Sequence, residues 1–365
     1  MKNILISNYP LRTDIIGSWN NRFVRLIESK NNPFDFILAP DFKVDTSARV
    51  LFYKTKKNKW FSHRYFTRYQ LIYHVAKNYI HILNKLLAEH PGQTLQILVV
   101  DDYTLIKALV LYKQQKQINR LKLIYSFHGH LLNADENFIN QVDKVLFLTS
   151  LGYKETVKHY FSFTPIVEIV GNGVNSNWFY PLDKQSKKKL RLENNLSPDA
   201  TILTWLANDR PSKGLHVFLE VAKKISILYP DIIFQIIGSN QKIEIKNVIS
   251  RGSVSLKDVA KYLQLSDFYF HTALVREGFG LTIAEAIKTG NIVLASNLGG
   301  IPETVGKYLD SRAFLIDFPN IPDAWVNKFT QVFKNDFPLL SMKDANEFWD
   351  YKNWEKRMLK GLNID

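Results

Sequence analysis

The sequence predicts an α/β protein built from two doubly wound domains of parallel strands and covering helices. Three observations favour this class. The 365 residues are enough for two domains of ordinary size. Hydrophobic residues make up 46% and charged residues 22% of the chain, which is typical of globular proteins. Short runs rich in Ile, Leu and Val alternate with segments of helical spacing, which is the pattern of βα units.

The first domain is expected to begin with a strand, a loop and a helix, as doubly wound domains do. Its strands are expected at 2–7, 36–39, 95–100, 122–126, 144–148 and 166–170, and its helices at 19–29, 105–112 and from 149 onward. Asp101, Asp102 and His128 follow two of these strands. Ligands of open parallel sheets bind at the carboxyl ends of the strands, so these side chains are candidates for a binding edge.

The second domain is expected to follow a polar, lysine-rich segment over 181–195, which we interpret as a linker. Its strands are expected at 201–207, 232–237, 248–254, 268–271 and 291–295, and its helices at 215–228, 256–265 and 348–362. The loop after the first of these strands carries Lys213 and Gly214. Because such a βα turn commonly binds phosphates, Lys213 is a candidate ligand for a diphosphate.

The most informative stretch is Arg276–Glu285. It holds two carboxylates, Glu277 and Glu285, with a Gly-Phe-Gly turn after the first and an apolar run of good helix formers around the second. This order predicts a turn followed by a helix. The first N–H groups of a helix have no intrahelical partner and favour a phosphate or a sugar oxygen. The eight-residue step is a little over two helical turns, so both carboxylates can face one cleft.

This stretch resembles the Glu-x7-Glu motif of retaining glycosyltransferases with the GT-B fold, most closely family 4, the group 1 transferases. Further segments that resemble this family are Asn172-Gly173-Val174, Phe179-Tyr180-Pro181, Lys213-Gly214, Arg251–Val254 and Gly299–Glu303. The resemblance is close over 166–365 and holds only in outline over 1–165. Where the family commonly has Pro-Ser after the strand 268–271, this chain has His271-Thr272-Ala273.

The resemblance implies a domain layout. Residues 1–178 would form a Rossmann-like acceptor-side domain, and residues 179–345 a Rossmann-like domain that binds the nucleotide sugar. Residues 346–365 would form a helix, carrying Trp354, that crosses back to the first domain. The donor would lie in a cleft that the two domains face.

The resemblance also implies roles for single residues. Lys213 would bind the diphosphate, Glu277 the donor sugar and Glu285 the ribose. A carboxylate suits the last two tasks because it accepts two hydrogen bonds from a pair of hydroxyls. His128 is expected near the transferred sugar, with His130 as the competing assignment, so the catalytic candidates are His128, Lys213 and Glu277. The remaining donor-binding candidates are Gly17, Arg210, Gly238, Val254, Gly278, Phe279, Gly280 and Leu281.

The implied reaction is retaining transfer of a sugar from a nucleotide-sugar donor, with a UDP-sugar favoured, to a glycan or lipid-linked acceptor. Cell-surface polysaccharide assembly is the expected setting. No cofactor and no metal are expected, since the Asp-x-Asp signature of the other large transferase fold is missing. Two alternatives remain: a sugar-nucleotide epimerase of the same fold, and a basic membrane- or nucleic-acid-binding protein without catalysis.

Residues 43–85 are the most unusual part of the chain. They hold ten Lys or Arg against one acidic residue, with nine aromatic residues interleaved, in a chain of net charge +14. This pattern predicts contact with an anionic membrane or with the acceptor. Nucleic acid is not expected. The alternative is a helix, over part of 65–87, that packs its tyrosines on the core and leaves its lysines in water.

Two absences in the sequence bound the setting. There is no cysteine, which excludes disulfides, Cys-ligated zinc and a thiol nucleophile. The first residues turn polar too soon for a signal peptide, and no stretch approaches the roughly eighteen apolar residues of a membrane span. We therefore expect a cytoplasmic protein, which could bind peripherally at the inner face of the cell membrane.

Overall fold

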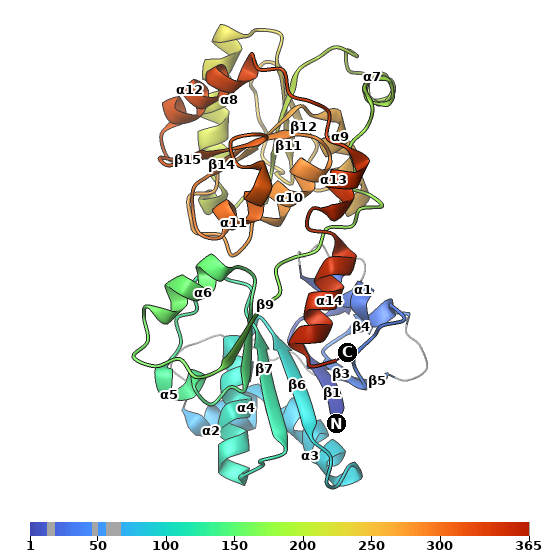
Figure 1. The fold of residues 1–365 in the computed structure, drawn as a ribbon, viewed down its shortest axis with the longest axis vertical. Helices are drawn as coiled ribbons and strands as arrows, with labels where there is room; N and C mark the ends of the chain where they lie inside the picture. The colour runs from blue at the N-terminus through green and yellow to red at the C-terminus, as the bar shows by residue number, and fades with distance from the viewer. Residues whose placement is uncertain (13–18, 46–49, 56–66, 365) are drawn as a thin grey trace. The chain divides into compact units, whose positions relative to one another are not determined.

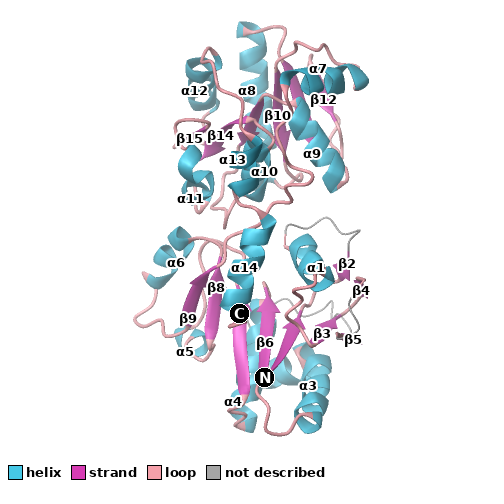
Figure 2. Cartoon of the chain, turned by 45° about the vertical axis from the view of Figure 1, so that its right-hand side comes forward, coloured by secondary structure: helices cyan, strands magenta, loops and turns pink. Residues whose placement is uncertain are grey.

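The computed structural model describes residues 1–12, 19–45, 50–55 and 67–364 (Figure 1). The chain divides into two compact units. Unit 1 consists of Met1–Gly171 with Glu355–Asp365, and unit 2 of Asn172–Trp354. Each unit has a parallel sheet flanked by helices, as the helix and strand colours of Figure 2 show. The predicted α/β class with doubly wound domains is confirmed.

In the described part of unit 1, seven parallel strands form a sheet in the order β5-β3-β1-β6-β7-β8-β9. They are β1 (Lys2–Ile6), β3 (Phe36–Ala39), β5 (Leu51–Lys54), β6 (Leu95–Val100), β7 (Leu121–Ser126), β8 (Lys144–Phe147) and β9 (Ile166–Ile169). A separate pair consists of β2 (Leu11–Arg12) and β4 (Phe42–Lys43). The first strand lies in the middle, so the order reverses between β1 and β6. Such a switch point is where open sheets bind ligands.

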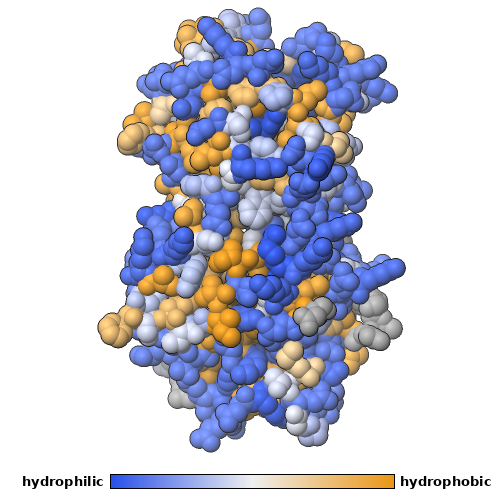
Figure 3. All heavy atoms as spheres, in the orientation of Figure 1, coloured by the Kyte–Doolittle hydropathy of each residue, from blue (hydrophilic) through white to orange (hydrophobic). Residues whose placement is uncertain are grey.

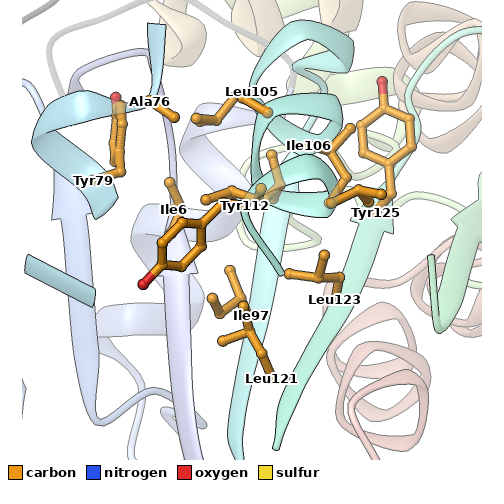
Figure 4. Packing of buried hydrophobic residues seen from close by; sticks show 14 of the residues in the cluster. Ile6, Ala76, Tyr79, Ile97, Leu105, Ile106, Tyr112, Leu121, Leu123 and Tyr125 are labelled. Atoms are coloured by element: carbon orange, nitrogen blue, oxygen red, sulfur yellow. The ribbon is translucent and has the colours of Figure 1, made fainter. Parts of the chain in front are cut away.

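The helices of unit 1 cover its sheet. They are α1 (Asn20–Glu28), α2 (Arg68–Gln70), the π-helix η1 (Leu71–Val75), α3 (Lys77–Glu89), α4 (Tyr103–Lys116), α5 (Glu136–Ile139) and α6 (Ser150–Val157). Figure 4 shows the core between sheet and helices, where Ile97 of β6 lies beside Leu121 of β7 and Leu105 of α4 lies near Ala76. All six residues of β6 are buried, and all except Gln96 are apolar, as expected for a strand covered on both faces.

The helix predicted within 65–87 is interrupted. A π turn at η1 separates α2 from α3, and the N–H of Ala76 bonds to the carbonyl of Leu71 at 3.0 Å. Leu71, Ile72, Ala76 and Tyr79 are all buried. The wider turn shifts the positions of the residues around the helix axis. As a result, the apolar residues before and after the turn both face the core, which they would not do in an uninterrupted helix of 3.6 residues per turn.

In the described part of unit 2, six parallel strands form a sheet in the order β12-β11-β10-β13-β14-β15. They are β10 (Ile202–Leu206), β11 (Ile233–Ile237), β12 (Val248–Ser250), β13 (Phe268–His271), β14 (Ile292–Ser296) and β15 (Ala313–Ile316). The helices are α7 (Lys184–Glu193), η2 (Pro211–Lys213), α8 (Leu215–Leu228), α9 (Leu256–Leu265), α10 (Leu281–Lys288), α11 (Ile301–Val305), η3 (Gly306–Tyr308), α12 (Pro322–Phe333) and α13 (Met342–Glu347). A further helix, α14 (Tyr351–Gly361), begins in unit 2 and ends in unit 1. This strand order is that of a Rossmann fold, with its switch point between β10 and β13.

The prediction of a linker over 181–195 was wrong. The segment forms α7, whose first turn is capped by Asp183 accepting from the N–H of Ser186 at 2.9 Å. The side chains of Lys187 and Arg191 bond to Asp267 at 2.8 and 2.6 Å. The lysine-rich composition had suggested a solvated linker, but Lys187 instead forms a salt bridge that holds α7 against the rest of unit 2.

The division between the units lies at Gly171–Asn172, so the predicted boundaries after residues 178 and 345 both fall inside unit 2. Asn172–Val174 stays with unit 2 because the N–H of Val174 bonds to the carbonyl of Trp349 at 2.8 Å. The last turns of α14 belong to unit 1. There the Nζ of Lys144 donates to the carbonyl of Gly361 at 2.8 Å.

The surface mixes polar and apolar residues. Figure 3 shows apolar residues in several separate patches on a face that is otherwise mostly hydrophilic. Within the described ranges, no helix combines the length and the apolar character that crossing a membrane requires.

Candidate active site

Two loops meet at the switch point of unit 2, after β10 and β13. The hydroxyl of Thr272 bonds to the carbonyl of Gly214 at 2.9 Å and accepts the indole N–H of Trp205 at 3.0 Å. A Cβ on Gly214 would lie 1.9 Å from the carbonyl oxygen of Thr272, and this glycine has a φ of +72°. Only glycine fits there. The close contact fixes Lys213 at the carboxyl edge of the sheet.

A charged triad lies at this edge. The Nζ of Lys213 is 2.5 Å from Oε1 of Glu277, and Nε2 of His271 is 3.9 Å from the same oxygen. The exposed side-chain fractions are 25% for Lys213, 17% for Glu277 and 8% for His271. The structure thus brings together Lys213 and Glu277, the two residues that the sequence predicted on separate loops.

Burial and charge set the ionisation of the triad. Burial favours a raised pKa for Glu277, but His271 and Lys213 outweigh it and hold the pKa below its ordinary value. Glu277 is therefore a carboxylate at neutral pH. Burial lowers the pKa of His271, and Lys213 lowers it further although Glu277 opposes the shift. The imidazole of His271 is therefore neutral at pH 7.

The backbone of Glu277 is held by the segment after β14. The N–H of Gly300 donates to the carbonyl of Glu277 at 2.8 Å, and Glu277 and Gly299 form a parallel bridge. A Cβ on Gly299 would lie 2.5 Å from that carbonyl oxygen, and Gly299 has a φ of +66°. Glycine at 299 is thus required for the approach of the two protein segments, which orients the Glu277 side chain.

Helix α10 begins beside this carboxylate. Its N-cap is Gly280, with a φ of +79°, and its first residue is Leu281. Phe279 is buried: its carbonyl accepts from the hydroxyl of Thr304, and its ring meets Trp349 edge-on at 4.8 Å. Glu285 is buried within α10. The loop from Glu277 to Leu281 therefore presents a carboxylate and a helix N-terminus on an anchored backbone.

The other predicted donor residues are distributed as follows. Gly238 ends β11, and its N–H donates to the carbonyl of Gly252 at 2.8 Å. Val254 is half-buried between β12 and α9. Arg210 is exposed, and its carbonyl accepts from the N–H of Lys213 at 2.8 Å. Gly17 lies outside the described residues.

A second polar edge lies at the switch point of unit 1. Asp101 follows β6 with a left-handed φ of 49°, and its Oδ1 accepts the backbone N–H of His128 at 3.2 Å. Burial raises the pKa of Asp101 to about 6, although this N–H opposes the shift and Asp102 adds to it. Asp102 is the N-cap of α4 and accepts from Leu105 N–H at 2.8 Å, so its part is structural.

His128 is the predicted histidine that faces this edge. Its Nε2 lies 3.0 Å from the hydroxyl of Ser126, and its ring packs against Trp19 at 6.2 Å between centroids. Burial and the nearby Arg22 lower the pKa of His128 to about 3, so the imidazole is neutral. The competing candidate, His130, is buried with its Nε2 2.5 Å from Glu155 of α6.

Three contacts were not predicted: the Thr272 hydroxyl beneath Gly214, His271 beside Glu277, and the backbone pairing of Gly299 with Glu277. Both His271 and Thr272 stand where the family pattern differs, and that difference was the available signal. Among residues whose placement is described, no group of three or more His, Cys, Asp or Glu could hold a metal ion.

Residues 186–349 match the family model of glycosyl transferases group 1. The chain is 27% identical over 161 residues to a phosphatidyl-myo-inositol mannosyltransferase of Propionibacterium freudenreichii, which is 44% of this chain and 40% of that protein. It is 25% identical over 217 residues to a lipopolysaccharide 1,2-N-acetylglucosaminetransferase of Salmonella typhimurium, 54% of this chain and 55% of that protein. The chain thus spans about half, or less, of the length of these relatives.

Solved structures resemble the whole chain. A sucrose-phosphate synthase from Thermosynechococcus elongatus matches with a TM-score of 0.73 at 14% identity, covering 100% of this chain and 98% of that one. Anabaena HepE in complex with UDP and glucose matches with a TM-score of 0.69 at 15% identity, covering 100% of both chains. Such likeness shows the fold. The chain therefore has the GT-B fold, and its residues 186–349 match the glycosyl transferases group 1.

Proposed function

We propose that this protein is a retaining, metal-independent glycosyltransferase of family 4. It would transfer a sugar from a nucleotide-sugar donor, with a UDP-sugar favoured, to a glycan or lipid-linked acceptor in cell-surface polysaccharide biosynthesis. The observation that carries the proposal is the Lys213–Glu277 pair at the switch point of unit 2, within the stretch that matches the family.

Each residue of the donor edge has a task in this reaction. The bond from the anomeric carbon to the diphosphate breaks, and the negative charge grows on the diphosphate. Lys213 and the N-terminus of α10 would stabilise that charge in place of a metal. Glu277, ionised beside the Lys213 ammonium group, would accept hydrogen bonds from hydroxyls of the donor sugar, and Glu285 from the ribose.

The edge of unit 1 suits a neutral acceptor. A new bond forms from the anomeric carbon to the acceptor oxygen, and the acceptor proton passes to the departing diphosphate on the same face of the sugar. His128, neutral because its pKa is depressed, would offer a hydrogen bond near the transferred sugar without adding charge. Retention requires no protein base in this scheme.

The relatives support the choice of acceptor class and donor. One curated relative is a phosphatidyl-myo-inositol mannosyltransferase, and another acts on lipopolysaccharide according to its name. One of the structures with the same fold holds UDP and glucose. A nucleotide-sugar donor and a lipid-linked or glycan acceptor are therefore the first substrates to test.

We also propose peripheral contact with an anionic membrane through residues 43–85 in a cytoplasmic protein. Residues 46–49 and 56–66 of this stretch lie outside the described residues. In the rest, Tyr79 is buried in the core, whereas Tyr69 and Tyr73 are 64% and 43% exposed and pack against each other at 4.7 Å. Exposed tyrosines near basic residues are compatible with an interface of lipid headgroups.

The test is an activity assay with EDTA present. The protein is incubated with UDP-sugars and a lipid-linked oligosaccharide fraction, and release of UDP is followed together with the anomeric configuration of the product by NMR. We expect UDP release that depends on acceptor and a product with the donor's configuration. An inverted product, or a 2-epimer of the donor formed without acceptor, would contradict the proposal.

A further inference from the structure

Two nitrogen groups in unit 2 are aimed at one carboxylate oxygen. The Nζ of Lys213 lies at bonding distance from Oε1 of Glu277, and Nε2 of His271 is 3.9 Å from the same atom. The second distance is too long for a hydrogen bond. In this ligand-free arrangement Lys213 is the bonded partner of Glu277, and His271 stands beside the pair.

His271 is enclosed and has bonding capacity to spare. Its Nδ1 is buried and has no hydrogen-bond partner among the described residues. Its backbone carbonyl accepts from Ser296 at 3.0 Å, which fixes the strand end that carries it. A buried imidazole nitrogen without a hydrogen-bond partner costs free energy of folding. Such a group in a folded protein calls for an explanation, and a role in ligand binding is one.

Few groups can set the charge of this imidazole. The charges that act on it in the described part of the chain are those of Glu277 and Lys213. The ring of Tyr269 lies 6.3 Å from it, but the Tyr269 hydroxyl donates to Thr282 at 2.7 Å, and burial raises its pKa so that it stays neutral. Burial is the largest cause of the lowered His271 pKa, and the position of the Lys213 ammonium group is the contribution that can change when an anion binds nearby.

The proposed function requires Lys213 to bind the donor diphosphate. Once Lys213 turns to the phosphates, Glu277 loses its bonded cation. A largely buried carboxylate left without a partner is unfavourable. At the same time the diphosphate offsets the charge of Lys213, which adds to burial in keeping His271 neutral, so His271 becomes easier to protonate.

We infer that His271 is a positioning residue that takes over the Glu277 carboxylate when Lys213 moves to the donor diphosphate, with uptake of a proton from solvent on the imidazole. The inference rests on the proposed function. No covalent bond changes: the Lys213–Glu277 pair is replaced by Lys213–diphosphate and imidazolium–Glu277. The exchange keeps Glu277 ionised and oriented for the hydroxyls of the donor sugar.

The first experiment needs no ligand. The imidazole of His271 is titrated by NMR in the wild type, in Lys213→Met and in Glu277→Gln, with His271→Asn to assign the signal. We expect Lys213→Met to raise the His271 pKa by roughly 1 unit or more, and Glu277→Gln to lower it. An unchanged titration in Lys213→Met would overturn the inference whether or not a donor is known.

The second experiment measures protons directly. UDP-glucose is titrated calorimetrically into the protein at pH 6.5 in buffers of different ionisation enthalpy. We expect uptake of a substantial fraction of a proton, about 0.3–1, by the wild type and by the exposed control His216→Asn, and almost none by His271→Asn and His271→Gln.

The outcomes separate the two claims. Binding heat that does not depend on the buffer in the wild type, or proton uptake that persists in both His271 variants, overturns the inference and leaves the proposed function standing. Absence of any binding heat counts against the proposed function, and with it against the movement of Lys213 on which the inference rests.

Discussion

The two units use the same topology to build edges of opposite electrostatic character. At the switch point of unit 2, burial favours a raised pKa for Glu277, but His271 and Lys213 keep this pKa below its ordinary value. At the switch point of unit 1, burial raises the pKa of Asp101 to about 6 and lowers that of His128 to about 3. One edge pairs a carboxylate with an ammonium group, and the other places a weakly acidic carboxyl beside a neutral imidazole.

The difference shows what the shared strand order leaves open. A doubly wound sheet places loops at its carboxyl edge but does not specify their chemistry. An ammonium group beside a helix N-terminus suits an anionic donor. A neutral imidazole suits a hydroxyl, because uncharged partners cost less to desolvate. On this ground we propose that the donor binds to unit 2 and the acceptor to unit 1.

The largest expected effect comes from removing the cation of unit 2. Lys213→Met should reduce transfer by about 10²–10³-fold or more, because the growing charge of the diphosphate loses its fixed partner. Lys242→Met is the matched control, since Lys242 is 87% exposed and pairs only with the exposed Glu244 among the contacts of the described chain. Equal rates for the two variants in the UDP-release assay would break the comparison.

Glu277→Gln should come next. The amide keeps the shape but is a poorer acceptor, so transfer should fall about 10²-fold, while binding of UDP, which has no sugar, should change only a few-fold. Glu220→Gln, on the exposed face of α8, is the control. A large loss of UDP affinity in Glu277→Gln would show that this carboxylate does not act on the sugar.

The turn that positions Lys213 should be sensitive to a single methyl group. Gly214→Ala puts a Cβ against the Thr272 carbonyl at a positive φ, so it should destabilise unit 2 by about 1–3 kcal/mol or more. Gly92→Ala has a similar φ of +77° with nothing within 4 Å and gives the cost of the φ alone. Equal melting temperatures for both variants would contradict the close contact.

Substitution of Asp101 should have the smallest effect. The sign of its effect on the free energy of unfolding distinguishes the edge of unit 1 from that of unit 2. Its folded pKa of about 6 exceeds the ordinary value of 3.8, so the stability it contributes is fully present below pH 3.8 and is lost as pH rises through 6. Asp101→Asn should therefore be more stable than the wild type at pH 7.5, by about 1–2 kcal/mol, and lose this advantage near pH 4.

Denaturant unfolding at the two pH values measures this. Asp102→Ala is the control, because it removes the cap of α4 and should destabilise unit 1 by about 1 kcal/mol at pH 7.5. If Asp101→Asn were less stable than the wild type at pH 7.5, Asp101 would be part of a stabilising charge pair, and unit 1 would resemble unit 2.

Much of the fold followed from local patterns. Buried strands such as β3 read as continuous apolar runs, and the turn and helix at Gly280–Lys288 followed from glycine and helix formers. β15 and α12 were overlooked although their signal was present, since Trp325 and Phe329 of α12 have helical spacing and are buried. The lysine-rich α7 was misread because charge was taken for exposure.

The residues of the site could be predicted from the sequence, but the contact between Lys213 and Glu277 could not. Lys213 and Glu277 are 64 positions apart, and only the packing of Thr272 against Gly214 and of Gly299 against Glu277 brings them together. Likewise, the ionisation of Asp101 and His128 depends on burial that the sequence does not state. Local motifs identify chemical groups, whereas distances and pKa shifts arise from contacts between distant segments.

The most direct test of the central claim is calorimetric titration of UDP into the wild type and into Lys213→Met, with EDTA present. The account predicts that the wild type binds without metal and that Lys213→Met binds at least about tenfold more weakly, a difference of roughly 1.4 kcal/mol. Equal affinity in the two proteins, or binding that EDTA abolishes, would contradict the assignment of Lys213 to the donor diphosphate.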